Sequence, residues 1–254
     1  MIDIDLRGKV AVVTGGTGEL GRVMVRTLGR AGADVVVGYL QNRAKGDELV
    51  ADLEGMGVRG MAIQVDVTDL DSVMALRDTA RKQLGPANII VNNAVIQYSW
   101  KHVLDQDAED YESQFRSCVL HNVFMAKAFV PDMIKKKWGR VIGINTECAM
   151  QYWENQSAYG SAKRGMDGVL RVLAREIGPH NITVNQVAPG YTLSENRHPS
   201  LSLSERQYVK NVPLKRRGTD QEIANVVAFL ASDLASFITG AYIPVSGGNV
   251  MPAI

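Results

Sequence analysis

The sequence predicts a single α/β domain in which a mostly parallel sheet of seven strands carries helices on both faces. Three observations predict this fold. Short apolar runs recur along the chain, stretches with apolar residues at helical spacing lie between most of them, and no linker or internal repeat interrupts the pattern. Strands and helices that alternate in this way form parallel strands joined by right-handed crossovers. We therefore expect residues 1–254 to form one domain.

The strands are expected where apolar, largely β-branched residues run almost without interruption, as they do in strands buried on both faces. Residues 107–136 and 157–178 show the clearest long helical patterns. Residues 190–218 break the alternation with a long polar insertion, which is typical of a substrate lid or a disordered loop. The predicted strands are KVAVVT (9–14), DVVVGY (34–39), MAIQVD (61–66), NIIVNN (88–93), RVIGIN (140–145), ITVNQV (182–187) and AYIPV (241–245).

Charge and composition argue against several functions. The chain has 28 basic and 27 acidic residues, a net charge of +1 and no basic domain, so nucleic acid or a membrane surface is not expected as the main partner. No apolar stretch approaches the roughly 18 residues that span a bilayer, and the start MIDIDLRGKV does not resemble a signal peptide. Two separate cysteines and four scattered histidines form neither a disulfide framework nor a zinc motif. We expect a cytoplasmic protein without a structural metal.

The stretch TGGTGELG (14–21) lies between the first predicted strand and the first predicted helix. Glycines in this position permit a tight turn and let the backbone approach a pyrophosphate, while the helix N-terminus presents N–H groups to the phosphates. A plain glycine turn is the alternative, but the context favours a dinucleotide site in a Rossmann-type, doubly wound domain. The contacts expected here are Gly15, Thr17, Gly18, Leu20 and Gly21.

The choice of cofactor depends on the residues about twenty positions later. A domain that binds NAD usually places an acid there, on the ribose 2′-hydroxyl. This chain has GYLQNR (38–43), with no acid and with Arg43. Neutral and basic groups suit a 2′-phosphate, so NADP is favoured over NAD. The alternative for Arg43 is a solvated residue at the start of a helix.

Tyr159 and Lys163 lie four residues apart in a predicted helix, so they share one face. An ammonium group near a phenol favours the phenolate and lowers the pKa of the tyrosine. Tyr159 could then serve as a general acid or base. The spacing alone is common by chance, but together with the glycine loop it indicates an oxidoreductase site.

Several further motifs occur in the order and spacing of one known family. The chain resembles the classical short-chain dehydrogenase/reductases over essentially its whole length, and its last segments resemble the 3-oxoacyl-[acyl-carrier-protein] reductase branch. The matching pieces are TGGTGELG, Asp66-Val67, Asn92-Asn93-Ala94, YGSAK (159–163), NQVAPGYT (185–192), PLKRRGTDQEIANVVAFLAS (213–232) and FITGAYIPVSGG (237–248).

The resemblance implies roles for the matching residues. Tyr159 would protonate a carbonyl oxygen while NADPH delivers hydride to the carbon, and Lys163 would bind the nicotinamide ribose and hold down the pKa of Tyr159. A homotetramer built on a four-helix contact is also implied. From the residues alone, Asp66 can equally be a helix cap, and Asn92 and Asn93 can be turn-forming amides. The other implied cofactor contacts are Asp66, Val67, Asn93 and Thr192.

The chain departs from the family pattern at four positions. Glu19 stands where the family has glycine; it suits the first turn of a helix but would repel a phosphate. Val95 adds bulk beside the cofactor. Thr146 replaces the catalytic serine and keeps its hydroxyl. Cys118 replaces the catalytic asparagine, whose hydrogen bonds a thiol cannot supply, and the alternative interpretation of Cys118 is a small buried hydrophobe. Asn122, one turn later, is a possible substitute.

These observations leave two hypotheses. The first is an NAD(P)-dependent oxidoreductase, with NADPH favoured, that acts on a carbonyl or secondary alcohol such as a 3-oxoacyl thioester or a related ketone. The second is a catalytically impaired member that binds a nucleotide as a sensor or partner subunit. Aromatic pocket walls suit an apolar or ring-bearing substrate. The candidate walls are Gln97, Tyr98, Trp100, Cys148, Tyr152 and Tyr191.

Overall fold

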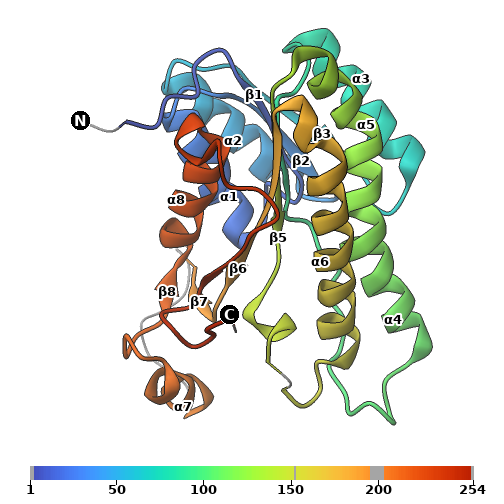
Figure 1. Cartoon of the computed structure of the whole chain (residues 1–254), viewed down its shortest axis with the longest axis vertical. Coiled ribbons are helices and arrows are strands. Elements are labelled where there is room, and N and C mark those ends of the chain that lie inside the picture. The colour runs from blue at the N-terminus through green and yellow to red at the C-terminus, as the bar shows by residue number, and fades with distance from the viewer. Residues whose placement is uncertain (1–2, 152, 195–202, 253–254) are drawn as a thin grey trace.

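A computed structural model describes residues 3–151, 153–194 and 203–252 of the chain. Seven parallel strands form one twisted sheet in the order β3-β2-β1-β4-β5-β6-β9 (Figure 1). All seven predicted strands are confirmed, with boundaries that shift by two residues at most. The strands are β1 (Val10–Val13), β2 (Asp34–Tyr39), β3 (Gly60–Gln64), β4 (Ile89–Asn92), β5 (Gly139–Ile144), β6 (Ile182–Pro189) and β9 (Tyr242–Val245).

Helices cover both faces of this sheet, as expected for a doubly wound domain (Figure 1). Alternate residues of each strand point to opposite faces, so Ala11 and Val13 pack in one apolar core and Val10 and Val12 in the other. The first core lies under α1 (Glu19–Arg30), α2 (Arg43–Gly55) and α8 (Asp220–Ala231); the second lies under α3 (Leu70–Gln83), α5 (His121–Lys136) and α6 (Ser157–Ile177).

The helix predicted over residues 107–136 is interrupted. It consists of α4 (Ala108–Gln114), a π-helical turn at Phe115–Leu120, and α5. The side-chain amide of Asn122 donates to the Cys118 carbonyl at 2.7 Å. In a regular α-helix that carbonyl would accept from the backbone N–H of residue 122, so the side chain takes over part of the helical hydrogen bonding. Apolar periodicity carries no signal for such a turn.

The polar insertion at 190–218 is partly regular in structure. It contains β7 (Thr192–Leu193), α7 (Leu203–Asn211) and β8 (Gly218–Thr219), and β7 pairs with β8. Residues 195–202 lie outside the described part of the chain. The insertion begins after β6 and therefore lies at the carboxyl ends of the strands, where parallel sheets bind ligands. Three short 3₁₀ turns complete the described elements: η2 (Glu147–Ala149), η3 (Gly178–His180) and η4 (Asp233–Ala235).

Candidate active site

The glycine loop joins β1 to α1 through two positions that exclude a side chain. Gly15 has a φ of +60°, and a Cβ there would lie 3.0 Å from the Ala94 Cα. A Cβ on Gly21 would lie 2.1 Å from the Gly15 carbonyl oxygen. Gly18 is the N-cap of α1 and provides no side-chain cap. The first N–H groups of the helix therefore remain available to an anion.

A cavity of about 920 Å³ extends from this loop to Thr146, Tyr159 and Lys163. Its walls come from the carboxyl ends of β1, β2, β3, β4, β5 and β6, which is where a dinucleotide binds in this class of fold. Of the residues predicted to contact the cofactor, Gly21 and Arg43 do not line the cavity. Those that do line it are Gly15, Thr17, Gly18, Leu20, Asp66, Val67, Asn93, Tyr159, Lys163 and Thr192.

The amide of Asn93 fastens the end of β4 to the glycine loop. Its Nδ2 donates to the carbonyls of Thr14 and Gly15, both at 3.1 Å. The Thr14 hydroxyl in turn accepts from the backbone N–H groups of Asn93 and Ala94, at 3.0 and 3.2 Å. Asn93 thus shapes the loop as well as lining the cofactor cavity.

Asp66 is not the N-cap of α3. That place belongs to Asp69, whose carboxylate accepts from the Asp71 N–H at 3.1 Å. The Asp66 carboxylate accepts from the backbone and hydroxyl of Thr68 at 2.8 and 2.7 Å, so it holds the turn that follows β3. This turn keeps Asp66 on the wall of the cofactor cavity.

Arg43 begins α2, as its alternative interpretation expects, and 66% of its side chain is exposed. Its Nε donates to Asp47, one turn later, at 2.8 Å. The residues that line the cavity beside it are Tyr39, Leu40, Gln41 and Asn42, none of them acidic.

Glu19 lies in the first turn of α1, as expected, and lines the cofactor cavity. The Arg22 guanidinium donates to both of its carboxylate oxygens, at 3.2 and 2.6 Å. Only 5% of the Arg22 side chain is exposed, against 56% for Glu19. A nearly buried cation therefore offsets the negative charge that Glu19 brings to the phosphate site.

Tyr159 and Lys163 both project from the first half of α6 toward the end of β5. The Lys163 ammonium donates to the Ile144 carbonyl at 2.6 Å and lies 5.7 Å from the centre of the Tyr159 ring. Thr146 follows β5 and lines the same cavity. Its hydroxyl accepts from the Cys148 N–H at 3.2 Å.

Electrostatics at this pair differ from the sequence-based expectation. We expected the Lys163 ammonium to lower the pKa of Tyr159. In the structure, burial dominates and raises the pKa of the Tyr159 phenol well above its usual value, with an opposing contribution from the Thr146 hydrogen bond. Burial likewise lowers the pKa of Lys163. Both shifts favour the neutral form of the side chain concerned.

Cys118 lines neither this cavity nor the substrate cavity described below. It is buried in the π-helical turn, with 1% of its surface exposed. The Asn122 amide bridges the Cys118 carbonyl and the Nδ2 of Asn92, both at 2.7 Å. Asn92, at the end of β4, is therefore buried and does not line the cofactor cavity. Asn122 lines neither cavity, so its suggested role as a substitute for the catalytic asparagine stays a prediction.

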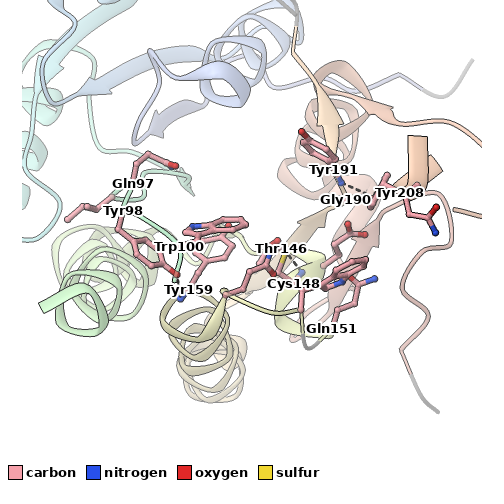
Figure 2. A pocket seen from close by; sticks show the side chains of 15 residues that line it. Gln97, Tyr98, Trp100, Thr146, Cys148, Gln151, Tyr159, Gly190, Tyr191 and Tyr208 are labelled. Carbon is pink, nitrogen blue, oxygen red and sulfur yellow. Dashed lines mark hydrogen bonds between the residues drawn. The ribbon is translucent and has the colours of Figure 1, made fainter. Parts of the chain in front are cut away.

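A second cavity, of about 610 Å³, adjoins the first. Both are lined by Ile96, Gln97, Thr146, Tyr159 and Gly190, so they meet at the catalytic hydroxyls. Figure 2 shows Trp100 beside Tyr159, with Tyr191 and Tyr208 on the opposite side of the cavity. We refer to it as the substrate cavity. The predicted walls Gln97, Tyr98, Trp100, Cys148 and Tyr191 all line it; Tyr152 lies outside the described residues.

Sequence reasoning missed several residues of the substrate cavity. Trp153 lines it from the loop before α6, and Gln207 and Tyr208 line it from α7. Glu147, directly after Thr146, also lines it. An acid immediately after the apolar run of β5 is a signal that could have identified this residue, whereas nothing in the α7 sequence indicates which of its side chains turn inward.

Within the described parts of the chain, no group of three or more His, Cys, Asp or Glu side chains is arranged to hold a metal ion. Within the same residues, no helix combines the length and apolarity that crossing a membrane requires.

Comparisons with known proteins cover nearly the whole chain. The family described as enoyl-(acyl carrier protein) reductase matches residues 17–249. The 3-oxoacyl-[acyl-carrier-protein] reductases of Pseudomonas aeruginosa and Escherichia coli are 36% and 35% identical to this chain, over 249 and 250 residues respectively. Each comparison covers 98% of this chain and 100% of the relative.

Solved structures of dehydrogenases also match nearly the whole chain. A 7α-hydroxysteroid dehydrogenase complexed with NADH and 7-oxo glycochenodeoxycholic acid is 30% identical, with a TM-score of 0.91 over 98% of this chain and 97% of its own. An NAD⁺-bound xylitol dehydrogenase is 27% identical, with a TM-score of 0.88 over 95% and 99% of the two chains.

Proposed function

The chain belongs to the short-chain dehydrogenase/reductase family, in its 3-oxoacyl-[acyl-carrier-protein] reductase-like branch, and we propose that it is an NADPH-dependent reductase of an apolar or ring-bearing ketone. As a member of this family it is an NAD(P)-dependent oxidoreductase that interconverts CH–OH and C=O groups. The preference for NADPH, the direction of the reaction and the kind of ketone are our proposals.

One observation carries the proposal: the cofactor cavity and the aromatic substrate cavity meet at Thr146 and Tyr159. A carbonyl placed at this junction would accept hydrogen bonds from both hydroxyls, because both side chains are present on the shared wall. The nicotinamide, when bound, supplies the hydride.

The residues of the chain supply the proton and the positions of the reactants. Tyr159 is protonated because burial raises its pKa, so it would donate its proton to the carbonyl oxygen as negative charge develops there. The protonated phenol is the form that carbonyl reduction requires. Lys163, fixed to the Ile144 carbonyl, would hold the ribose beside Tyr159.

The cavity fits a dinucleotide through its glycine loop and the free N-terminus of α1. The absence of an acid among Tyr39, Leu40, Gln41 and Asn42 supports NADP, because a carboxylate there would repel the 2′-phosphate. Arg43 would have to turn from Asp47 to reach that phosphate.

We also propose a cytoplasmic location and a homotetramer. Two free cysteines, one buried and one half-buried, are consistent with a reducing compartment. The outer face of α5 and α6 carries an apolar hollow of about 540 Å³, which a four-helix contact between copies would cover.

Titration with NADPH and NADH, followed by a ketone panel, tests the proposal. We expect NADPH to bind at least about tenfold more tightly than NADH, a difference of about 1.4 kcal/mol. Ketone-dependent NADPH oxidation should fall by about three orders of magnitude in Tyr159→Phe, as expected for loss of a general acid held in place. Tyr111→Phe, which removes a hydroxyl that bonds Ser157 outside both cavities, is the matched control. Cofactor binding without turnover of any ketone would contradict the proposal and favour a nucleotide sensor.

A further inference from the structure

The substrate cavity has a pronounced charge asymmetry. Among the described residues that line it, Glu147 is the only acid, and no lysine, arginine or histidine takes part. The rest of the wall consists mainly of aromatic rings and glutamine amides. An anionic substrate group buried here would face an acidic side chain, and the described wall offers no cation to compensate it, which is costly.

Glu147 is a buried acid whose carboxyl group is surrounded by hydrogen-bond donors. It is 4% exposed, and its Oε2 accepts from the Asn249 Nδ2 at 3.0 Å. Further hydrogen bonds from the Tyr208 hydroxyl and the Tyr191 backbone lower its pKa, although burial outweighs them and raises the pKa above its usual value. Each of these partners donates, and donors favour the ionised form of a carboxyl group. The reaction mechanism leaves this buried acid unused.

The aromatic side chains of the cavity are suited to a cation. Trp100 and Trp153 are about half exposed and line the cavity, and tryptophan is the best cation–π partner. The lid already contains such a contact, since the Arg217 guanidinium carbon lies 3.9 Å from the centre of the Tyr191 ring. Arg217 itself pairs with Glu205 at 2.5 Å and does not line the cavity.

The nearest catalytic cation does not neutralise Glu147. Lys163 lines the cofactor cavity and not the substrate cavity, and its ammonium donates to the Ile144 carbonyl. The described wall of the substrate cavity therefore has one acidic side chain and no basic one, and this acid is next in sequence to the Thr146 that would bind the carbonyl.

We propose that this cavity selects ketones that carry an ammonium group, recognised by Glu147 and by the rings of Trp100 and Trp153. The inference rests on the proposed reductase function and specifies its substrate class: a carbonyl at Thr146 and Tyr159, with a positive charge a short distance away. Ketones with a carboxylate in the corresponding position are excluded.

A pair of ketones that differ only in charge tests this inference. The cation 1,1-dimethyl-4-oxopiperidinium and the neutral 4,4-dimethylcyclohexanone have the same shape. Binding is followed through tryptophan fluorescence in the complex with NADP⁺, where ketone reduction cannot proceed. We expect the cation to bind at least about tenfold more tightly than its neutral counterpart at low salt.

Two variants locate the source of the preference. Glu147→Gln keeps the size of the side chain and an oxygen for Asn249, and it should reduce the charge preference to about threefold or less. The control Glu54→Gln removes an equal charge from an exposed position on α2 and should leave the preference intact. The NADPH affinity of each variant, and its melting temperature, verify that the fold is retained.

Trp100→Leu provides an independent check, because it should weaken the preference while Glu147 is intact. Equal binding of the two ketones by the unaltered protein would overturn the inference, and so would a preference that survives in Glu147→Gln. The proposed function is judged separately, by turnover in the ketone panel: reduction of neutral ketones without any charge preference would preserve the function and reject the substrate class.

Discussion

At the scale of single residues, Glu19 shows how one departure from the family pattern is accommodated. Its carboxylate lies on the wall of the cofactor cavity and receives two hydrogen bonds from the nearly buried Arg22. The pair lies at the N-terminus of α1, where an anionic phosphate would bind. Because Glu19 is paired with Arg22 and exposed to solvent, its carboxylate repels that phosphate only weakly.

We predict that Glu19→Gln increases the affinity for NADPH by about two- to fivefold, corresponding to less than about 1 kcal/mol. The gain should shrink as salt rises from 0.05 to 0.5 M, because screening weakens the repulsion that the substitution removes. Fluorescence titration of bound NADPH measures it. Glu54→Gln, distant from the loop, should not change the affinity. A weaker affinity in Glu19→Gln would mean that Glu19 serves mainly to hold Arg22 in place.

Tyr159 determines how activity depends on pH. Burial raises the pKa of its phenol, so the proton is retained through the neutral range. Reduction needs the protonated phenol, and oxidation of the alcohol needs the phenolate. We predict that kcat for ketone reduction stays flat from about pH 6 to 9, while kcat for alcohol oxidation rises by up to about tenfold per pH unit. A fall in reduction between pH 6 and 8 would show that the phenol has a lowered pKa instead.

The sequence predicted that Tyr159 and Lys163 share one face of a helix and that the glycine loop follows the first strand, and the structure has both features; the catalytic roles of these residues stay predictions. Tyr159 and Lys163 follow from helical spacing, and Gly15 from its place after a strand. The pKa of Tyr159 could not be predicted, because it depends on how deeply the folded chain buries the phenol and on the electrostatic influence of Cys118, Cys148 and Tyr98, which come from three separate segments of the chain. Tyr208 was missed for a similar reason, because it lines the substrate cavity from α7, a segment far from the other walls in the sequence.

At the scale of elements, the N-terminus of α8 is capped directly after the insertion at 190–218 ends. Thr219 ends β8 and caps α8: its hydroxyl accepts from the Glu222 N–H at 3.2 Å, while the Glu222 carboxylate accepts from the Thr219 N–H at 2.9 Å. This reciprocal capping box satisfies N–H groups that the first turn of a helix otherwise leaves unpaired.

We predict that Thr219→Ala lowers the free energy of unfolding by about 1 kcal/mol. The urea midpoint should decrease while the m-value stays constant, because the exposed surface does not change. Thr219→Ser keeps the hydroxyl and should retain most of the stability. If the serine and alanine variants were equally destabilised, the methyl group of Thr219 rather than the cap would be the stabilising feature.

The sequence predicted those helices and strands that have a clear periodic pattern of apolar residues. Alternation of apolar runs located all seven strands, since a strand buried on both faces has a simple signature. The π-helical turn at Phe115–Leu120 was missed, because it depends on the side chain of Asn122 competing for a backbone carbonyl. The short pair of β7 and β8 was also missed, since two residues per strand give no pattern.

At the scale of the whole molecule, the outer face of α5 and α6 remains apolar after the two cores are formed. Val172 of α6 is 58% exposed, and it lines a hollow whose polar lining is small. An exposed apolar patch of this kind is typical of an interface between subunits. The resemblance to the family, which uses these helices in a four-helix contact, points to a second copy of the chain as the occupant.

We therefore predict a homotetramer that Val172→Asp disrupts. A charge placed where two helices meet must lose its hydration without gaining a partner, and the cost is several kcal/mol.

Light scattering coupled to size-exclusion chromatography should give four times the 27.7 kDa chain mass for the unaltered protein and a smaller assembly for the variant. Leu104→Asp, at an exposed apolar residue in the loop before α4, should leave the mass unchanged. Because the active site lies at the carboxyl ends of the strands and is built within one chain, the smaller assembly should still bind NADPH. A monomeric mass for the unaltered protein would reject the tetramer, and the apolar face would then have to be covered by something other than this chain.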